Sequence, residues 1–300
     1  MELWIPITLA AAFLQNLRSA LQKHLKTSLS TAGATYVRLV FAVPLAVVYV
    51  AGLWEFGGYP LPEPGWAFLT YASVGGAAQI FATALLVHLF SHRNFAVGTA
   101  FSKTETVQTA IIGAIILLEP VGLWAVIAIL VSLAGVLALS VARGQTGWRG
   151  LVIGLVQRTA LIGILSGSFF GVAAVCYRAA SLSLGGDGFI MQAAFTLVCV
   201  ITLQTVAMSA YMRIREPGQI TRAIAAWRVA AWVGLTGMAA SACWFTAMTI
   251  QNAAYVRALG QIELVFTFIA AHFIFRERTN ATEVTGIVLI VAGILILITA

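Results

Sequence analysis

Charged residues are scarce in this 300-residue sequence, which excludes an ordinary water-soluble globular protein. Only 9% of the residues are charged and 61% are hydrophobic. Apolar runs of about 20 residues, the length needed to span a bilayer, recur from end to end. The connections between them are too short to hold a soluble domain. We therefore expect a single membrane domain.

Cysteine is also rare, and its placement excludes a disulfide framework or a redox dithiol. Cys176, Cys199 and Cys243 each fall inside an apolar run without a paired spacing. His88 and His92 are one helical turn apart, but no cysteine or carboxylate accompanies them as a further metal ligand. We expect no cofactor and no metal. A cleavable signal peptide is not expected either, because no basic segment precedes the first apolar run.

Ten apolar runs predict an all-α integral membrane protein with ten transmembrane helices. Glycine-rich and proline-rich breaks separate several of them, as at residues 57–64 and 185–188. The predicted spans are 4–22, 33–53, 66–90, 95–117, 121–141, 158–182, 188–212, 228–250, 253–275 and 281–299.

Basic residues alternate between successive connections, and this alternation predicts the orientation. The net charge of +7 is spread over short loops, so we do not expect nucleic acid as a partner. One face holds nearly all of the basic loop residues, and the other holds Glu55, Glu63, Glu119 and Asp187. Cytoplasmic loops are enriched in Lys and Arg. We expect the plasma (cell inner) membrane, with both termini outside the cytoplasm.

The two halves of the chain resemble each other at a constant offset of 158 residues. Seven positions of the first half recur in the second: Asn94, Ala96, Ala100, Glu105, Glu119, Ala134 and Gly135 match Asn252, Ala254, Ala258, Glu263, Glu277, Ala292 and Gly293. Five helices per half is an odd number, so the second half must have the opposite polarity in the membrane. The pattern predicts two inverted five-helix repeats.

With these features the chain resembles the EamA-type branch of the drug/metabolite transporter superfamily. The resemblance rests on a basic residue ending the first helix, an early arginine in the second, and repeated acid and glycine positions: Lys23, Arg38, Glu119, Gly135, Glu277 and Gly293. It implies a first repeat at 1–142, a cytoplasmic connection at 143–157 and a second repeat at 158–300. It also implies a transporter that exports more often than it imports, and not an enzyme.

Two acids deep in predicted spans are the leading candidates for function. Glu105 and Glu263 each lie about ten residues into a span, or roughly 15 Å, which is near the midplane. Lys103 shares a polar helical arc with Glu105, and Arg257 and Gln261 share one with Glu263. We expect these arcs to line a central cavity, with both acids as candidates for ion coupling. The alternative is an internal salt bridge that only ties helices together.

Other polar residues within the spans are secondary candidates for contact with a solute. Asn16 and Gln79 could bind a solute or join helices through hydrogen bonds, and Trp244 could stack on a solute or pack in the core. Arg18 and Arg38 lie nearer the cytoplasmic ends of their helices, where an arginine can extend to the lipid headgroups.

Three glycines in the sixth span, Gly163, Gly167 and Gly171, recur every four residues and predict a groove for close helix packing. The partner is either an internal helix or a second copy, so a homodimer stays open. We expect this groove to lie apart from the solute site.

Both signs of charge in the expected cavity favour a small zwitterion, such as an amino-acid-like metabolite, moved by alternating access. One alternative is proton-coupled efflux of organic cations through the two glutamates. A membrane-embedded enzyme is the other, but no clustered nucleophile and base is present in the sequence.

Overall fold

The computed structural model describes residues 2–25, 29–89, 100–143, 157–186, 188–269, 272 and 279–299, which form helices and connections with no strand among them. The chain divides into two compact units. Unit 1 comprises Met1–Ala77 and Cys176–Gln251, and unit 2 comprises Ala78–Val175 and Asn252–Ala300. Each unit thus takes segments from both halves of the chain. The boundaries fall inside α4 (Trp66–Leu89) and α9 (Arg158–Ser183) and directly after α12 (Trp227–Ile250).

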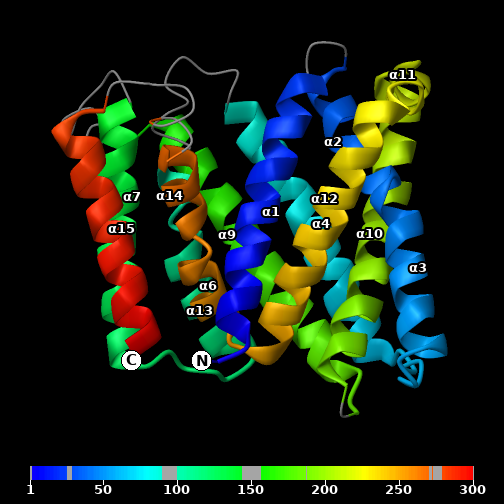
Figure 1. The fold of residues 1–300 in the computed structure, drawn as a ribbon, viewed down its shortest axis with the longest axis horizontal. Helices are drawn as coiled ribbons and strands as arrows, with labels where there is room; N and C mark the ends of the chain where they lie inside the picture. Colours follow the sequence, from blue (N-terminus) through cyan, green and yellow to red (C-terminus); the bar gives the residue numbers. More distant parts are fainter. Residues whose placement is uncertain are drawn as a thin grey trace. The chain divides into compact units, whose positions relative to one another are not determined.

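Unit 1 is built around the packing of α1 along α12. Its other complete helices are α2 (Thr31–Val40), α3 (Ala42–Glu55), α10 (Phe189–Arg215) and α11 (Gln219–Ala225). α1 (Trp4–Leu25) runs beside α12, and α10 packs against α12, α2 and α3 (Figure 1). The core between them is largely aliphatic.

The predicted span at 33–53 consists of two helices, α2 and α3, which meet at Phe41. Pro44 has no N–H to donate to the carbonyl of Val40, so one helical hydrogen bond is missing where the two helices meet. The backbone of Phe41 packs against Gly234 of α12, at a site with no room for a side chain. The break between α2 and α3 therefore lies where the backbone of Phe41 packs closely against α12.

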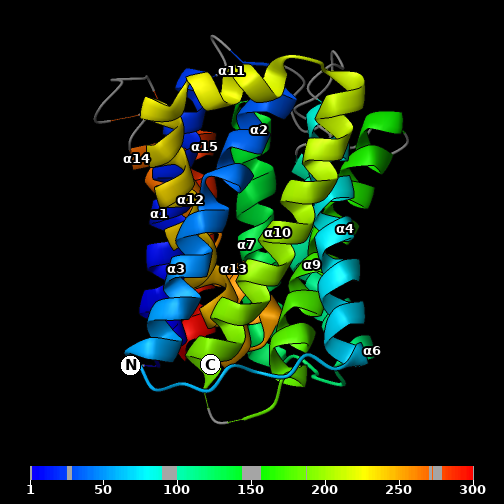
Figure 2. The same cartoon turned by 90° about the vertical axis from the view of Figure 1, so that its right-hand side faces the viewer.

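The short helix α11 falls in a stretch that the sequence analysis places in a loop. It follows Gly218, whose φ of 86° lies in the left-handed region that glycine adopts readily. In Figure 2, α11 crosses the ends of α2, α10 and α12, and it packs against all three. The Ser30 hydroxyl donates to the Glu216 carboxylate at the same end. α11 therefore closes one end of unit 1.

Arg178 of α9 joins α9 to the last turn of α12 within unit 1. Its guanidinium donates to the carbonyls of Met248 at 2.7 Å, Thr249 at 3.1 Å and Gln251 at 2.8 Å. The last carbonyls of a helix have no intrahelical partner. Arg178 donates hydrogen bonds to these carbonyls, and backbone oxygens thereby satisfy its guanidinium group.

Unit 2 is built around an antiparallel pair, α7 (Leu123–Arg143) and α15 (Ala281–Thr299), which lie side by side (Figure 1). A side chain at Gly135 would meet Gly286 and Ile290, and one at Gly293 would meet Ala128 and Ser132. The remaining helices are α6 (Glu105–Ile116), α13 (Ala253–Leu259) and α14 (Ile262–Ile269), with residues 78–89 of α4 and 158–175 of α9.

The helices of the described residues include seven that are long and apolar enough to cross a membrane. They are Thr31–Glu55, Trp66–Leu89, Leu123–Ala142, Arg158–Ser183, Phe189–Arg215, Trp227–Ile250 and Ala281–Thr299. Each of the ten predicted spans overlaps a described helix, but ten crossings and an inverted repeat stay predictions. Most of the predicted connection at 143–157 lies outside the described residues.

Candidate functional site

The helix that precedes Glu105 is broken directly before this acid. Residues 100–102 are helical, Lys103 and Thr104 form a turn, and α6 begins at Glu105. In the turn, the Lys103 amide donates to the carbonyl of Ala100 at 3.1 Å, and the Thr104 amide donates to that of Phe101 at 3.2 Å. These bonds span three residues instead of four, so the chain is locally wound more tightly.

A second break precedes Glu263. α13 ends at Leu259, Gly260 and Gln261 form a turn, and α14 begins at Ile262. The Gln261 amide donates to the carbonyl of Ala258 at 3.2 Å. The offset of 158 residues carries Lys103 to Gln261, so the breaks occupy corresponding places in the two halves. Each acid lies in the first turn of the helix that follows its break, where the helix dipole favours negative charge.

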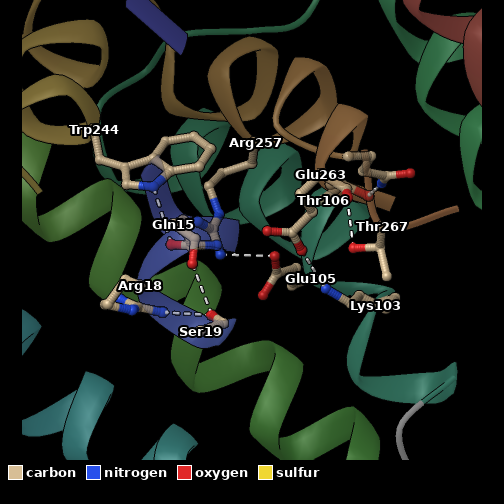
Figure 3. A network of polar contacts seen from close by, with 11 residues as sticks. Gln15, Arg18, Ser19, Lys103, Glu105, Thr106, Trp244, Arg257, Glu263 and Thr267 are labelled. Atoms are coloured by element: carbon tan, nitrogen blue, oxygen red, sulfur yellow. Dashed lines mark hydrogen bonds and ion pairs between the residues drawn. The ribbon is translucent and has the colours of Figure 1, made fainter. Parts of the chain in front are cut away.

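Two ion pairs connect the segments around these breaks within unit 2 (Figure 3). Arg257 Nη2 donates to Glu105 Oε1 at 2.7 Å, and Lys103 Nζ donates to Glu263 Oε1 at 2.8 Å. The exposed fractions of these side chains run from 13% for Glu105 to 29% for Lys103. The four charges are therefore neither fully buried nor fully solvated.

The structure brings together the four charged residues that the sequence analysis placed on two facing arcs. The pairing is crossed, however. The sequence pattern associates Glu105 with Lys103 of its own helix and Glu263 with Arg257, whereas each acid is paired with the basic residue of the other segment. The ion pairs join the two segments because α6 and α13 pack against each other. Whether these residues bind a solute stays a prediction.

Gln261 and Gln79 are the amide candidates in unit 2. Gln261 is 6% exposed, and its Nε2 donates to Thr106 Oγ1 at 3.3 Å. Its Oε1 has no hydrogen-bond partner among the described residues. A buried amide oxygen without a hydrogen-bond donor is energetically costly, which makes this oxygen a candidate acceptor for the predicted solute. Gln79 is half-buried on α4.

The other predicted candidates, Asn16 and Trp244, belong to unit 1. Trp244 is 7% exposed, and its Nε1 donates to Gln15 Oε1 at 3.1 Å (Figure 3). Asn16 follows Gln15 on α1 and is half-buried. Gln15 was not among the predicted site residues. The signal that could have found it is its polar side chain beside Asn16 in an otherwise apolar run.

The glycines of α9 were expected to lie apart from the predicted solute site, but Gly167 packs against the segment that carries Glu105. An added Cβ there would lie 2.8 Å from the Ser102 carbonyl oxygen and 3.3 Å from the Glu105 amide. At Gly171 it would lie 3.2 Å from the Thr109 amide. The groove therefore receives the broken helix that carries Glu105. Gly163 is buried on the same helix.

Comparison with known proteins adds a family and a fold. Residues 157–299 match the EamA-like transporter family. No curated protein matches the chain. The chain also matches 27 chains of solved structures. One of them, titled only "Crystal structure of protein", has a TM-score of 0.72 at 15% sequence identity. The match covers 98% of this chain and 95% of that one, which shows a shared fold.

The family match agrees with the all-helical structure and its apolar helices. Members of the family are transporters, not enzymes, and act on small-molecule solutes within a lipid bilayer. The match of its second half places this multi-pass membrane protein among the EamA-like transporters of the drug/metabolite transporter superfamily.

Proposed function

We propose that this protein is a secondary transporter of a small zwitterionic, amino-acid-like metabolite, working by alternating access and mainly in export. The observation that carries the proposal is the pair of crossed ion pairs at two corresponding helix breaks. Interrupted helices near the membrane midplane are typical of solute sites in transporters with internal repeats.

A zwitterion suits this site because it can exchange partners with an ion pair without leaving a charge uncompensated. Between Lys103 and Glu263, its ammonium group would meet the carboxylate and its carboxylate group the lysine. The site would then be electrically balanced both empty and occupied, which matters where water is scarce. An organic cation would displace Lys103 from Glu263 and leave the lysine without a partner. This difference favours the zwitterion over proton-coupled cation efflux.

The inverted repeat that alternating access requires is supported by the packing of unit 2. If α7 and α15 are the fifth helices of the two repeats, inversion requires them to run in opposite directions. They do, and the corresponding residues Gly135 and Gly293 both occupy positions where the other helix approaches closely. Rocking of such repeats around a fixed site would expose it to each side in turn.

Flux into liposomes tests the proposed solute class. We expect the purified protein to move an amino acid but neither the amine that lacks its carboxylate nor the acid that lacks its amine. A neutral sugar serves as the control. Glu263→Gln and Lys103→Gln should each impair transport of the amino acid. Faster transport of the amine, unaffected by Lys103→Gln, would instead establish the cation alternative. Cells loaded with the active solute should lose it faster when they express the protein.

The orientation is a separate proposal, supported by unit 1. Arg213, Arg215, Arg222 and Arg228 lie at the end that α11 closes, and Glu55 ends α3 at the opposite side. We place the basic end in the cytoplasm of the cell and both termini outside.

Labelling of intact cells with an impermeant thiol reagent tests this orientation. In a protein without its native cysteines, Glu63→Cys should react and Thr221→Cys should not. Both positions are exposed, and neither has the positive φ of Gly58 or Gly218, so a cysteine causes no backbone strain. Labelling only at position 221 would show that the protein has the opposite orientation to the one proposed.

A further inference from the structure

The end of unit 1 that α11 closes carries four exposed arginines. They are Arg213 and Arg215 in the last turn of α10, Arg222 on α11 and Arg228 in the first turn of α12. Glu216 is the one acid of unit 1 among the described residues at this end. Within the part of the chain that the structure describes, none of the four arginines forms an ion pair with a carboxylate. This end of unit 1 therefore presents an excess of positive charge to its surroundings.

Exposed apolar residues lie among these arginines. Ile214 is 78% exposed, Trp227 57% and Ile224 53%, so more than half of the surface of each is available for contact. Each lies within two residues of one of the arginines along the chain. The guanidinium carbon of Arg228 lies 5.9 Å from the centre of the Trp227 ring, so a charge and an aromatic surface are adjacent. We call these seven residues the α11 patch: Arg213, Ile214, Arg215, Arg222, Ile224, Trp227 and Arg228.

α11 lies across the ends of the long apolar helices instead of along them. It crosses the ends of α2, α10 and α12 and packs against all three (Figure 2). On its inner face, Ala223 is fully buried and Ile220 packs against the aliphatic core of unit 1. Its exposed face bears Arg222 and Ile224. A helix with basic and apolar residues on its exposed face, placed across the ends of membrane spans, suits a position in the plane of the membrane surface.

The headgroup of an anionic phospholipid fits the composition of the α11 patch. Arginine binds phosphate oxygens through its planar guanidinium fork. Tryptophan is enriched at the level of the lipid headgroups, where its ring contacts both polar and apolar surroundings. A nucleic acid or an acidic soluble protein would use the arginines but would leave the two isoleucines and Trp227 exposed to water. The combination of charge and apolar surface therefore favours a lipid.

We propose that the α11 patch binds the phosphate group of an anionic phospholipid at the membrane surface, with its apolar residues in contact with the acyl chains. Four arginines at one end of a unit repel one another, and a bound phosphate reduces this repulsion. The lipid also contacts α10, α11 and α12 together, because each of them contributes to the patch. Binding therefore stabilises unit 1.

This lipid site depends neither on the zwitterion transport proposed for unit 2 nor on the proposed orientation. The α11 patch belongs to unit 1, and the crossed ion pairs belong to unit 2. Binding is measured in detergent, where neither flux nor the side of the membrane enters the result. Loss of zwitterion transport would leave lipid binding intact, and loss of lipid binding would leave the crossed ion pairs unchanged.

Thermal unfolding of the full-length protein in detergent, at constant ionic strength, tests the site. Phosphatidylglycerol is the probe, and phosphatidylcholine with the same acyl chains is the control. We expect a saturable rise in Tm with phosphatidylglycerol that clearly exceeds the effect of phosphatidylcholine. The double variant Arg222→Gln/Arg228→Gln should weaken phosphatidylglycerol binding about 30-fold, because each basic residue near an anionic lipid surface contributes about fivefold. Thr221→Ala, at the exposed uncharged position beside Arg222, should bind like wild type.

A further variant and a further probe distinguish a bound lipid from diffuse charge attraction and from a soluble anion. Trp227→Ser retains all four arginines and should still weaken phosphatidylglycerol binding, because contact with the acyl chains is lost. Glycerol phosphate, which has the phosphate but no acyl chain, should give no comparable rise in Tm. The Trp227 variant also decides the test if the double variant does not fold.

Equal effects of the two lipids on Tm would overturn the proposal, as would wild-type binding of phosphatidylglycerol by the double variant. Wild-type binding by Trp227→Ser would assign the effect to diffuse attraction by the arginines. An equal rise with glycerol phosphate would assign the arginines to a soluble anion. Either of these two results would also overturn the lipid site.

Discussion

Reversing the charge of Lys103 is expected to abolish transport, and reversing Glu263 in the same protein is expected to restore folding without restoring transport. Lys103→Glu places two carboxylates where one ion pair stood. Breaking a buried pair costs about 3 to 5 kcal/mol. The exposed fractions of 29% and 20% favour the lower part of that range. The double variant Lys103→Glu/Glu263→Lys re-forms an ion pair at the same place, with the positive and negative charges exchanged between the two positions.

The double variant separates a solute site from a structural tie. A tie needs only opposite charges, so the exchanged pair would recover both Tm and transport. A zwitterion needs its ammonium and carboxylate groups in a fixed order relative to the rest of the site. We therefore expect Tm to return close to the wild-type value while flux stays reduced about 100-fold, which corresponds to about 3 kcal/mol of lost recognition.

The exchange of Glu105 and Arg257 is the matched comparison, since that pair likewise joins the two segments and contains the other of the two corresponding acids. Thermal melts and liposome flux are measured on the same preparations. Recovery of full flux in both double variants would make the two ion pairs structural and remove them from the candidate site.

The repeat offset was readable from the sequence because it depends only on residue identity. Glu105 and Glu263 were found in this way, and so were Gly135 and Gly293. Long apolar helices were readable too, since a bilayer imposes a minimum length on every span. These are the features on which the family resemblance rests.

The breaks before Glu105 and Glu263 could not be predicted in the same way. Lys103 and Thr104 do not terminate helices strongly, and neither turn contains a proline. The crossed ion pairs depend on how α6 packs against α13, which no spacing along one helix encodes. The two compact units could not be predicted from the sequence for the same reason, because each combines segments far apart in the chain.

Replacing Gly135 or Gly293 by leucine is expected to prevent folding, because the backbones of helices α15 and α7 pack directly against each other at these glycines. A Cβ at Gly135 would lie 2.6 Å from the Gly286 carbonyl oxygen and 2.8 Å from the Ile290 amide. A Cβ at Gly293 would lie 2.7 Å from the Ala128 carbonyl oxygen, and still closer to the Ser132 hydroxyl. Backbone atoms cannot turn aside as a side chain can, so the helices must separate. Overpacking typically costs about 1 to 3 kcal/mol, and more where nothing yields.

Gly52→Leu is the matched control for these two variants, since it introduces the same side chain into an apolar helix where an added Cβ meets nothing within 4 Å. We expect this control to keep the wild-type Tm and elution profile, while both α7–α15 variants lose the monodisperse peak. The smaller change Gly293→Ala should lower Tm. Ser132→Ala should not rescue it, because removing the hydroxyl leaves the Ala128 carbonyl oxygen and the Ser132 amide within 2.9 Å of the new methyl group. Rescue by Ser132→Ala would show that a side chain limits the approach of the two helices. A wild-type Tm for Gly293→Leu would show that they do not meet at this glycine.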